Sequence, residues 1–196
     1  MKTVIIFDHP YTATAGENVP HHRSFLAALL KTTMAKLTQA GETIDLIDLH
    51  ADHFNPVMTA DDLTNWRRGL PTDSQVANYQ QRLRDADRII FMFPVWWEVV
   101  PAMTKGFLDK VYAKGQLYDA KSMRTTLVKQ PKIELITTMS TPNWAYRLIF
   151  GAPLAKALFR GTFLKTRLWH FHWHNFAQVE KKSLAERETI LRNFKL

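Results

Sequence analysis

The sequence predicts an α/β fold of the doubly wound type, with a parallel five-stranded sheet in the order 2-1-3-4-5 and helices on both faces. Two observations carry this prediction. Short, unbroken apolar runs, typical of strands buried on both faces, recur along the chain. Segments with apolar residues three or four positions apart, typical of amphipathic helices, separate these runs. Because no repeat or linker interrupts the alternation, we predict a single domain over residues 1–196.

Each predicted element follows from its local pattern. The strands are Thr3–Phe7, Thr43–Leu49, Arg88–Phe93, Lys132–Thr138 and Arg167–Phe171, the last with an open extension to His174. The helices are His22–Gln39, Ser74–Arg84, Pro101–Ala113, Asn143–Phe159 with a break near Gly151–Pro153, and Ser183–Phe194. Glycine after a helix and proline at its first position are the stop and start signals used. The connections 8–21 and 51–73 are longer than this fold needs, which is typical of functional loops.

The composition narrows the function classes. No apolar run approaches the roughly 20 residues that cross a bilayer, so we expect a protein that does not span membranes. The absence of cysteine excludes disulfides and thiol nucleophiles and fits a cytoplasmic protein. The net charge of +8 would suit nucleic acid or phosphorylated small molecules. Because the cations are scattered and no nucleic-acid-reading motif accompanies them, we expect no nucleic-acid partner.

Several familiar catalytic motifs are absent from the sequence. It contains no G-x-G-x-x-G after the first strand, no G-x-x-x-x-G-K-[ST] and no G-x-S-x-G. A dinucleotide fingerprint, a Walker loop and a nucleophile elbow are therefore excluded.

Three strand-to-helix junctions remain at the edge where open α/β sheets bind ligands. His9 and Ser24, with Phe25 opening the helix, could bind a phosphate, although Ser24 could equally be only a helix cap. At the second junction, two tryptophans offer apolar surface to a planar ring, unless they belong to the core. The third junction is rich in hydroxyl side chains. The second junction comprises Pro94, Val95, Trp96 and Trp97, and the third comprises Thr137, Thr138, Met139, Ser140, Thr141 and Pro142. Their convergence favours a ligand site.

The segment Trp169–His174 alternates aromatic and histidine residues. In a strand this would place three imidazoles on one face, which could bind zinc or copper. A half-exposed edge strand explains the pattern equally well, and no carboxylate follows at a matching spacing. We therefore predict no metal site.

These residues resemble the flavodoxin-like NAD(P)H:quinone oxidoreductases of the DT-diaphorase type, especially the short bacterial NAD(P)H dehydrogenases. The resemblance covers nearly the whole chain. Its landmarks are His9, Ser24–Phe25, Phe54–Val57, Phe93–Trp97, Pro101–Phe107, Ile136–Thr138 and the helix start at Tyr146–Leu148. The aromatic strand end followed by P-A-x-x-K-G-[FW] is the most specific of these.

The resemblance implies a flavin, FAD more often than FMN, and a cytoplasmic homodimer with active sites at the subunit interface. It places the phosphate and ribityl chain at His9, Ser24 and Phe25, and the isoalloxazine ring between Pro94–Trp97 and Thr137–Ser140. Trp97 and Tyr146 would be the catalytic residues. The implied reaction is two-electron hydride transfer from NAD(P)H through flavin N5 to a quinone or similar acceptor.

The chain departs from the family pattern at three points. Glu98 and Val99 replace an aromatic residue and a glycine, Met139–Ser140 replaces a glycine pair, and Leu26 stands where some members have asparagine. Two alternatives stay open: a regulatory flavoprotein of a potassium-efflux system, and a basic nucleic-acid-binding domain.

Overall fold

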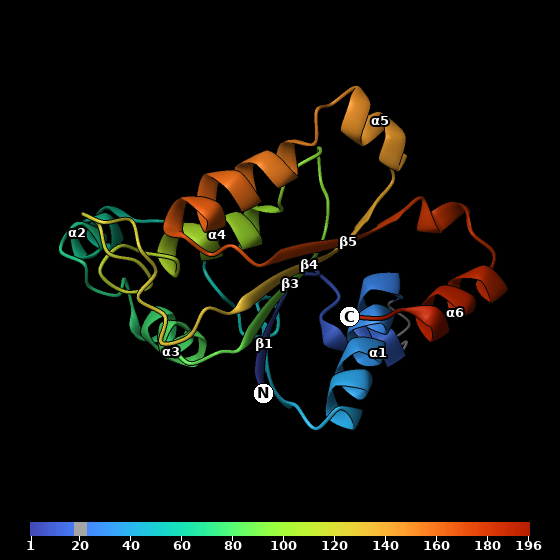
Figure 1. Cartoon of the computed structure of the whole chain (residues 1–196), viewed down its shortest axis with the longest axis horizontal. Coiled ribbons are helices and arrows are strands. Elements are labelled where there is room, and N and C mark those ends of the chain that lie inside the picture. Colours follow the sequence, from blue (N-terminus) through green and yellow to red (C-terminus); the bar gives the residue numbers. More distant parts are fainter. Residues whose placement is uncertain (18–22) are drawn as a thin grey trace.

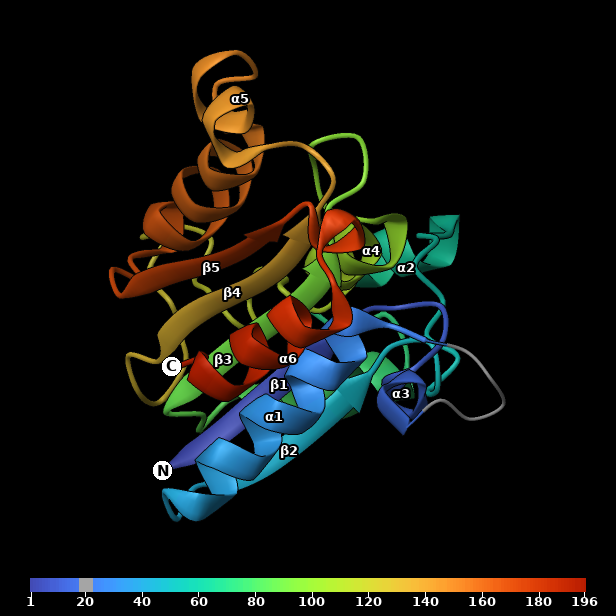
Figure 2. The same cartoon turned by 90° about the vertical axis from the view of Figure 1, so that its right-hand side faces the viewer.

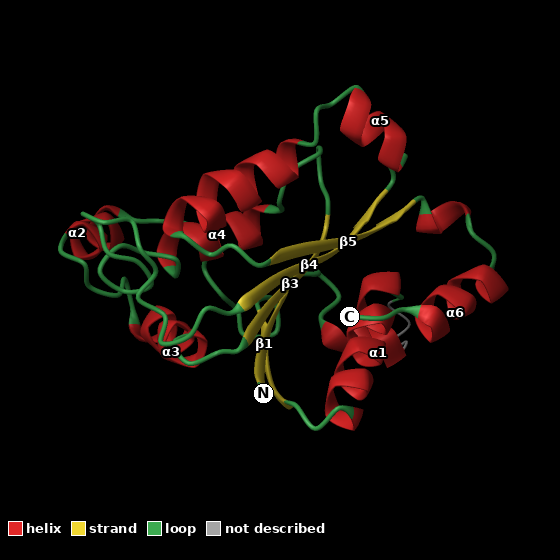
Figure 3. Cartoon of the chain, viewed as in Figure 1, coloured by secondary structure: helices red, strands yellow, loops and turns green. Residues whose placement is uncertain are grey.

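The computed structural model describes residues 1–17 and 23–196. Its centre is a five-stranded, all-parallel sheet in the order β2-β1-β3-β4-β5 (Figure 1, Figure 3). The strands are β1 (Lys2–Phe7), β2 (Thr43–Asp48), β3 (Arg88–Pro94), β4 (Lys132–Met139) and β5 (Phe171–Ala177). The predicted fold class and strand order are confirmed.

Helices cover both faces of the sheet (Figure 1, Figure 2). One face carries η1 (Ala13–Glu17), α1 (Phe25–Gln39) and α6 (Leu184–Asn193). The other carries α3 (Ser74–Leu83), α4 (Ala102–Lys110) and a π-helix, η2 (Ala155–Phe163). The remaining elements are α2 (Ala60–Arg67), α5 (Asn143–Leu148), η3 (Leu164–Thr166) and η4 (Val179–Lys181). No helix in the described ranges is both long and apolar enough to cross a bilayer.

The pleat of the strands divides the buried residues into two cores. In β1, Val4 and Ile6 pack toward α3, α4 and η2, whereas Ile5 and Phe7 pack toward α1. Successive side chains of a strand point to opposite faces, so an unbroken apolar run fills both layers. This explains why the central strands read as continuous apolar segments.

The predicted start of the fifth strand is wrong. Arg167 has a left-handed backbone, φ +64°, and ends η3. Leu168 is buried, but its N–H donates to Phe163 O and so closes the preceding helix. The strand begins only at Phe171, which pairs with Ile133 of β4. An apolar run does not distinguish a residue buried in a turn from one buried in a strand.

Two helix predictions also change. The connection after β2 contains α2, whose capping box of Thr59 and Asp62 is visible in the sequence as T-x-x-D. The first helix begins at Phe25, and the predicted start at His22 lies outside the described residues. The predicted break near Gly151–Pro153 is confirmed, because α5 ends at Leu148 and η2 begins at Ala155.

The landmark loop after β2 packs directly on α4. A Cβ added to Gly106 would lie 2.3 Å from Pro56 Cβ and 2.4 Å from Pro56 O, so only glycine fits there. One turn later, Lys110 is almost fully buried and donates to Asn55 O at 3.2 Å. Its Nζ also lies 3.4 Å from Asp62 and 3.3 Å from Asp73. These contacts fix α4, and with it the loop that precedes α4 at the carboxyl edge of the sheet.

Candidate functional site

Two loops meet at the carboxyl edge of the sheet and enclose a cavity. Pro94, the last residue of β3, pairs with Thr138 of β4, and Val95 N–H donates to Thr138 O at 2.8 Å. This register places the β3–α4 loop beside the β4–α5 loop. The resulting cavity of about 520 Å³ is lined by Val95, Trp96, Trp97, Glu98, Met139, Ser140 and Thr141. The second and third predicted junctions therefore meet in one site.

A tight turn presents Trp97 to solvent. Trp96 and Val99 exchange two backbone hydrogen bonds of 3.2 and 3.1 Å, which close a hairpin turn. Trp97 and Glu98 occupy its centre with φ of +48° and +65°. This conformation normally selects asparagine or glycine, so both residues are strained. Trp97 is 97% exposed, which rules out the alternative that it is a core tryptophan.

The cavity is bordered by backbone donors without partners. Within the described part of the chain, the N–H groups of Trp97, Glu98, Ser140 and Thr141 donate no hydrogen bond. Unpaired N–H groups on residues that line a cavity favour an acceptor-rich or negatively charged ligand edge.

Hydrogen bonds connect the two loops. The Glu98 carboxylate accepts a hydrogen bond from Thr141 Oγ1. Tyr146 of α5 donates its hydroxyl to Glu98 O at 3.1 Å and accepts from Leu154 N–H at 2.9 Å. Burial, with the Glu98 charge adding to it, raises the pKa of Tyr146 to about 12. The Tyr146 hydroxyl is therefore neutral and already bonded to two backbone groups.

Three predicted site residues of these two junctions, Pro94, Thr137 and Thr138, do not line the cavity. Thr137 is fully buried in β4, where its hydroxyl donates to Asn175 Oδ1 and accepts from Trp173 Nε1, both at 2.8 Å. Because side chains alternate along a strand, the Thr137 side chain projects from the same face of the sheet as Trp173 and Asn175 of β5 and is buried there. Its side chain has no surface open to a ligand.

The first predicted junction lies at the ends of β1 and the start of α1. Ser24 caps α1 by accepting from Ala27 N–H at 3.2 Å, and Phe25 packs against Phe176. His9 Nδ1 accepts from Tyr11 N–H at 3.1 Å. Burial, with His50 nearby, lowers the pKa of His9 and so favours the neutral ring. Because Nδ1 accepts a hydrogen bond, the proton of the neutral ring is on Nε2.

Beneath His9, a buried carboxylate joins three elements. Asp8 accepts from Thr104 N–H at 2.8 Å and Thr104 Oγ1 at 2.6 Å, both on α4. Its other oxygen lies 3.0 Å from His50 Nε2, which follows β2. This cluster fixes the end of β1 relative to α4, a role that needs the tertiary register and that sequence reasoning missed.

The histidine-rich strand forms a charge network at the opposite end of the sheet. Because β5 begins at Phe171, only His172 and His174 share a face, with ring centroids 4.3 Å apart. The register adds a carboxylate that the sequence spacing could not reveal, since Glu134 pairs with His172 and lies 3.8 Å from His174. Burial raises the pKa of Glu134, but the nearby His174 and the charge of Arg88 outweigh it, so the pKa is lowered. No group of three metal-ligating side chains occurs among residues 1–17 and 23–196.

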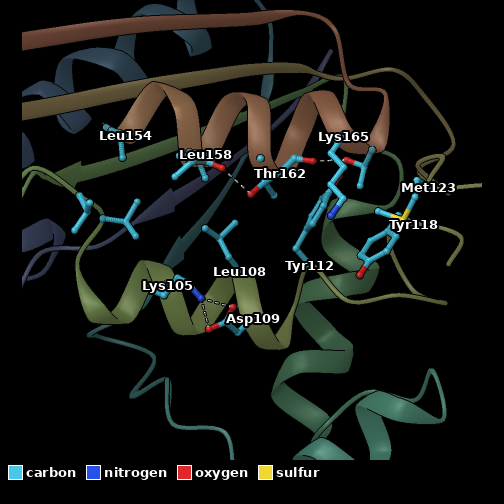
Figure 4. A pocket seen from close by; sticks show the side chains of 15 residues that line it. Lys105, Leu108, Asp109, Tyr112, Tyr118, Met123, Leu154, Leu158, Thr162 and Lys165 are labelled. Carbon is cyan, nitrogen blue, oxygen red and sulfur yellow. Dashed lines mark hydrogen bonds and ion pairs between the residues drawn. The ribbon is translucent and has the colours of Figure 1, made fainter. Parts of the chain in front are cut away.

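A second, apolar cavity of about 460 Å³ runs between α4 and η2 (Figure 4). Leu108 of α4 and Leu158 of η2 face each other across it, and Tyr118, Met123 and Lys165 lie at one end. We call this cavity the α4–η2 groove. Sequence reasoning missed it, because a groove depends on the distance between two helices and not on either helix alone.

An exposed apolar segment follows the β4–α5 loop in the chain. It comprises Trp144, Leu148, Ile149 and Phe150 of α5 and the residues after it, which are 52–81% exposed. Figure 2 shows α5 standing out from the body of the molecule. We call this segment the α5 arm.

A doubly wound sheet with a two-loop cavity at its carboxyl edge defines a class of small-molecule-binding α/β proteins. The family model described as "Flavodoxin-like fold" matches residues 1–194. The chain belongs to this flavodoxin-like family.

Individual relatives are consistent with this assignment. The ribosyldihydronicotinamide dehydrogenase (quinone) of Pongo abelii is 29% identical over 131 residues, which cover 59% of this chain and 57% of that protein. The chain spans 51–57% of the length of the first curated relatives. The structure of Smu.1420 from Streptococcus mutans UA159 has a TM-score of 0.80 at 27% identity and covers 98% of this chain and 95% of its own. An FMN-dependent NADH-azoreductase from Bacillus anthracis, solved with FMN, has a TM-score of 0.76 at 14% identity, with 97% and 94% covered, and shares the fold.

Proposed function

We propose that this protein is a flavin-dependent NAD(P)H oxidoreductase that transfers two electrons to a quinone or a similar acceptor. The observation that carries the proposal is the cavity at the carboxyl edge, where the exposed Trp97 and four unpaired backbone N–H groups meet. Relatives named as quinone dehydrogenases support the same reaction class.

The donor set of the cavity fits a flavin. The isoalloxazine ring is flat and apolar on its faces and carries carbonyl oxygens and ring nitrogens along one edge. Indole surface from Trp96 and Trp97 suits the faces, and the N–H groups of Glu98 and Ser140 suit the edge. Such donors also stabilise the negative charge of the reduced ring. When bound, the flavin accepts and releases hydride at N5; the protein orients the reactants and excludes water.

For the flavin tail, we propose that His9, Ser24 and Phe25 hold the phosphate and ribityl chain. The neutral His9 ring supports this role, since its Nε2–H is a donor directed away from the Tyr11 contact. The backbone around Pro94, Val95, Thr138 and Met139 would complete the ring pocket, with Thr137 supporting it from inside the sheet. FAD is the expectation from the sequence, but two solved structures with this fold are described as complexes with FMN, so we propose FMN.

We also propose a cytoplasmic homodimer. The α5 arm exposes four large apolar side chains, and clusters of exposed apolar residues often mark protein interfaces. The open, apolar α4–η2 groove of a second copy would offer that arm a matching surface. The regulatory alternative needs a docking patch far from the cofactor cavity, whereas the α5 arm begins at Trp144, three residues after Thr141, which lines that cavity.

The test begins with the purified protein. We expect a yellow protein whose heat-released cofactor co-elutes with FMN, and which oxidises NADH or NADPH in the presence of a quinone. Trp97→Ala should lower turnover or raise the KM for the acceptor while leaving the circular dichroism spectrum unchanged. Trp169→Ala is the matched control, because Trp169 is a 59%-exposed tryptophan just before β5, at the opposite edge of the sheet. A colourless protein that neither FMN nor FAD activates would refute the proposal.

A further inference from the structure

The Trp97 indole has almost no packing contact with the described part of the chain. Its side chain is 97% exposed. The direction of the indole is set by the turn at Trp97 and Glu98, where both residues adopt a left-handed conformation without being glycine. Side chains in this conformation are strained, so the turn keeps its shape only if its surroundings hold it.

Glu98 and Tyr146 supply that restraint from two directions. The Glu98 side chain accepts from Thr141 Oγ1 and so ties the turn to the β4–α5 loop. The Tyr146 hydroxyl donates to Glu98 O and accepts from Leu154 N–H, which ties the turn to α5 and to the start of η2. Tyr146 is itself 1% exposed and fixed by an edge-to-face contact with Trp173. The strained turn is therefore anchored to rigid, buried structure.

The Glu98 carboxylate is only partly hydrogen-bonded, which costs free energy. Its Oε2 atom is buried and has no hydrogen-bond partner, so the contact with Thr141 is the only hydrogen bond that this carboxylate makes in the described chain. Buried acceptors are normally satisfied, and exceptions cluster at functional sites. An acidic side chain kept in this state favours a positional role over a purely stabilising one.

We propose that Glu98 and Tyr146 are positioning residues that hold the turn so that Trp97 and the N–H groups of Trp97 and Glu98 face the cofactor. This inference rests on the proposed flavin-dependent function. It assigns Tyr146 a role through Glu98, in place of direct contact with the reacting groups, because both hydrogen-bonding directions of its hydroxyl are already used.

Four variants test the proposal. Glu98→Gly removes the restraint but relieves the backbone strain, whereas Glu98→Ala removes the restraint and keeps the strain. Glu98→Gln keeps an oxygen acceptor for Thr141, and Tyr146→Phe keeps the ring but deletes the hydroxyl. Glu188→Ala, at an exposed site on α6, is the matched control.

Two measurements are made on each variant. Amide hydrogen exchange of the segment 95–100 is followed in the flavin-free protein, and the Kd for FMN is measured by fluorescence quenching. We expect faster exchange and an FMN Kd about tenfold weaker in Glu98→Gly and Tyr146→Phe, and values within about threefold of wild type in Glu98→Gln and in the control. Glu98→Gly should nevertheless melt at a higher temperature than Glu98→Ala.

The outcomes separate the possible failures. If FMN affinity simply follows melting temperature across the variants, the residues are only structural and the inference is wrong. A Glu98→Gln variant as impaired as Glu98→Gly would refute the hydrogen-bond account. If the wild-type protein binds no FMN, the proposed function fails, while the exchange data on the flavin-free protein still decide whether Glu98 and Tyr146 restrain the turn.

Discussion

Gly106→Ala tests how closely the β2–α2 connection must approach α4. The new Cβ would lie 2.3 Å from Pro56 Cβ, 2.4 Å from Pro56 O and 2.5 Å from Pro56 Cα. Two of these are main-chain atoms, so the loop itself must move. Trimming the Pro56 side chain would not relieve the clash.

The size of the effect follows from two opposing contributions. Overpacking a well-packed contact costs about 1–3 kcal/mol, and the main-chain clash puts this case at the upper end. Alanine is favoured over glycine inside a helix by about 1 kcal/mol, which leaves a net loss of about 2 kcal/mol. For a chain of 196 residues, this lowers Tm by about 4–8 °C. Displacing the loop also weakens the hydrogen bond from Lys110 to Asn55 O.

Differential scanning calorimetry of the purified variant measures this loss. Gly161→Ala is the matched control, because its Cβ would meet Lys156 O at 3.5 Å, an ordinary contact in η2. We expect the control to melt at or slightly above the wild-type temperature. A Gly106→Ala protein that melts within 1 °C of wild type, an allowance of about half a kcal/mol, would refute the reasoning.

Three further predictions concern other parts of the fold. Lys110→Met should lower the free energy of unfolding, measured in urea, by about 2 kcal/mol, because it leaves the Asp62 and Asp73 carboxylates without their cation. The partial exposure of Asp73 limits the loss. Unchanged stability would show that the buried ammonium is not needed. The pKa of His9 is lowered from its ordinary value of 6.5 by burial and by His50, so an unfolded chain takes up that proton first as the pH falls. The stability that neutral His9 contributes is therefore present above pH 6.5 and lost as the pH falls from there through the folded pKa. The free energies of unfolding of wild type and His9→Asn, measured in urea, should converge at low pH. A difference between the two proteins that stays constant with pH would contradict this. Ile149→Ser on the α5 arm should shift the proposed dimer toward monomer in analytical ultracentrifugation, whereas Leu184→Ser, at an apolar site on α6 that is slightly more exposed, should not. An unchanged sedimentation coefficient in Ile149→Ser would exclude the arm from the interface.

The local pattern was sufficient for the fold class and for most elements. Unbroken apolar runs marked β1 and β3, because a strand buried on both faces is apolar at nearly every position. The same reasoning failed at Arg167–Phe171, where a single buried Leu168 closes a helix and the true strand starts later. The capping box at Thr59 is the sequence signal that marks the start of α2.

The chain alone also determined which loops form the candidate site, because the carboxyl ends of parallel strands must share one edge of the sheet. Only the tertiary structure decided which side chains at that edge are free. It placed Thr137 inside the sheet, engaged the Tyr146 hydroxyl with Glu98 and Leu154, and left Trp97 in solvent. Register, backbone conformation and the distance between helices depend on contacts between residues far apart in sequence. The sequence pattern indicates which residues are buried, but it does not indicate which residues they contact in the folded protein.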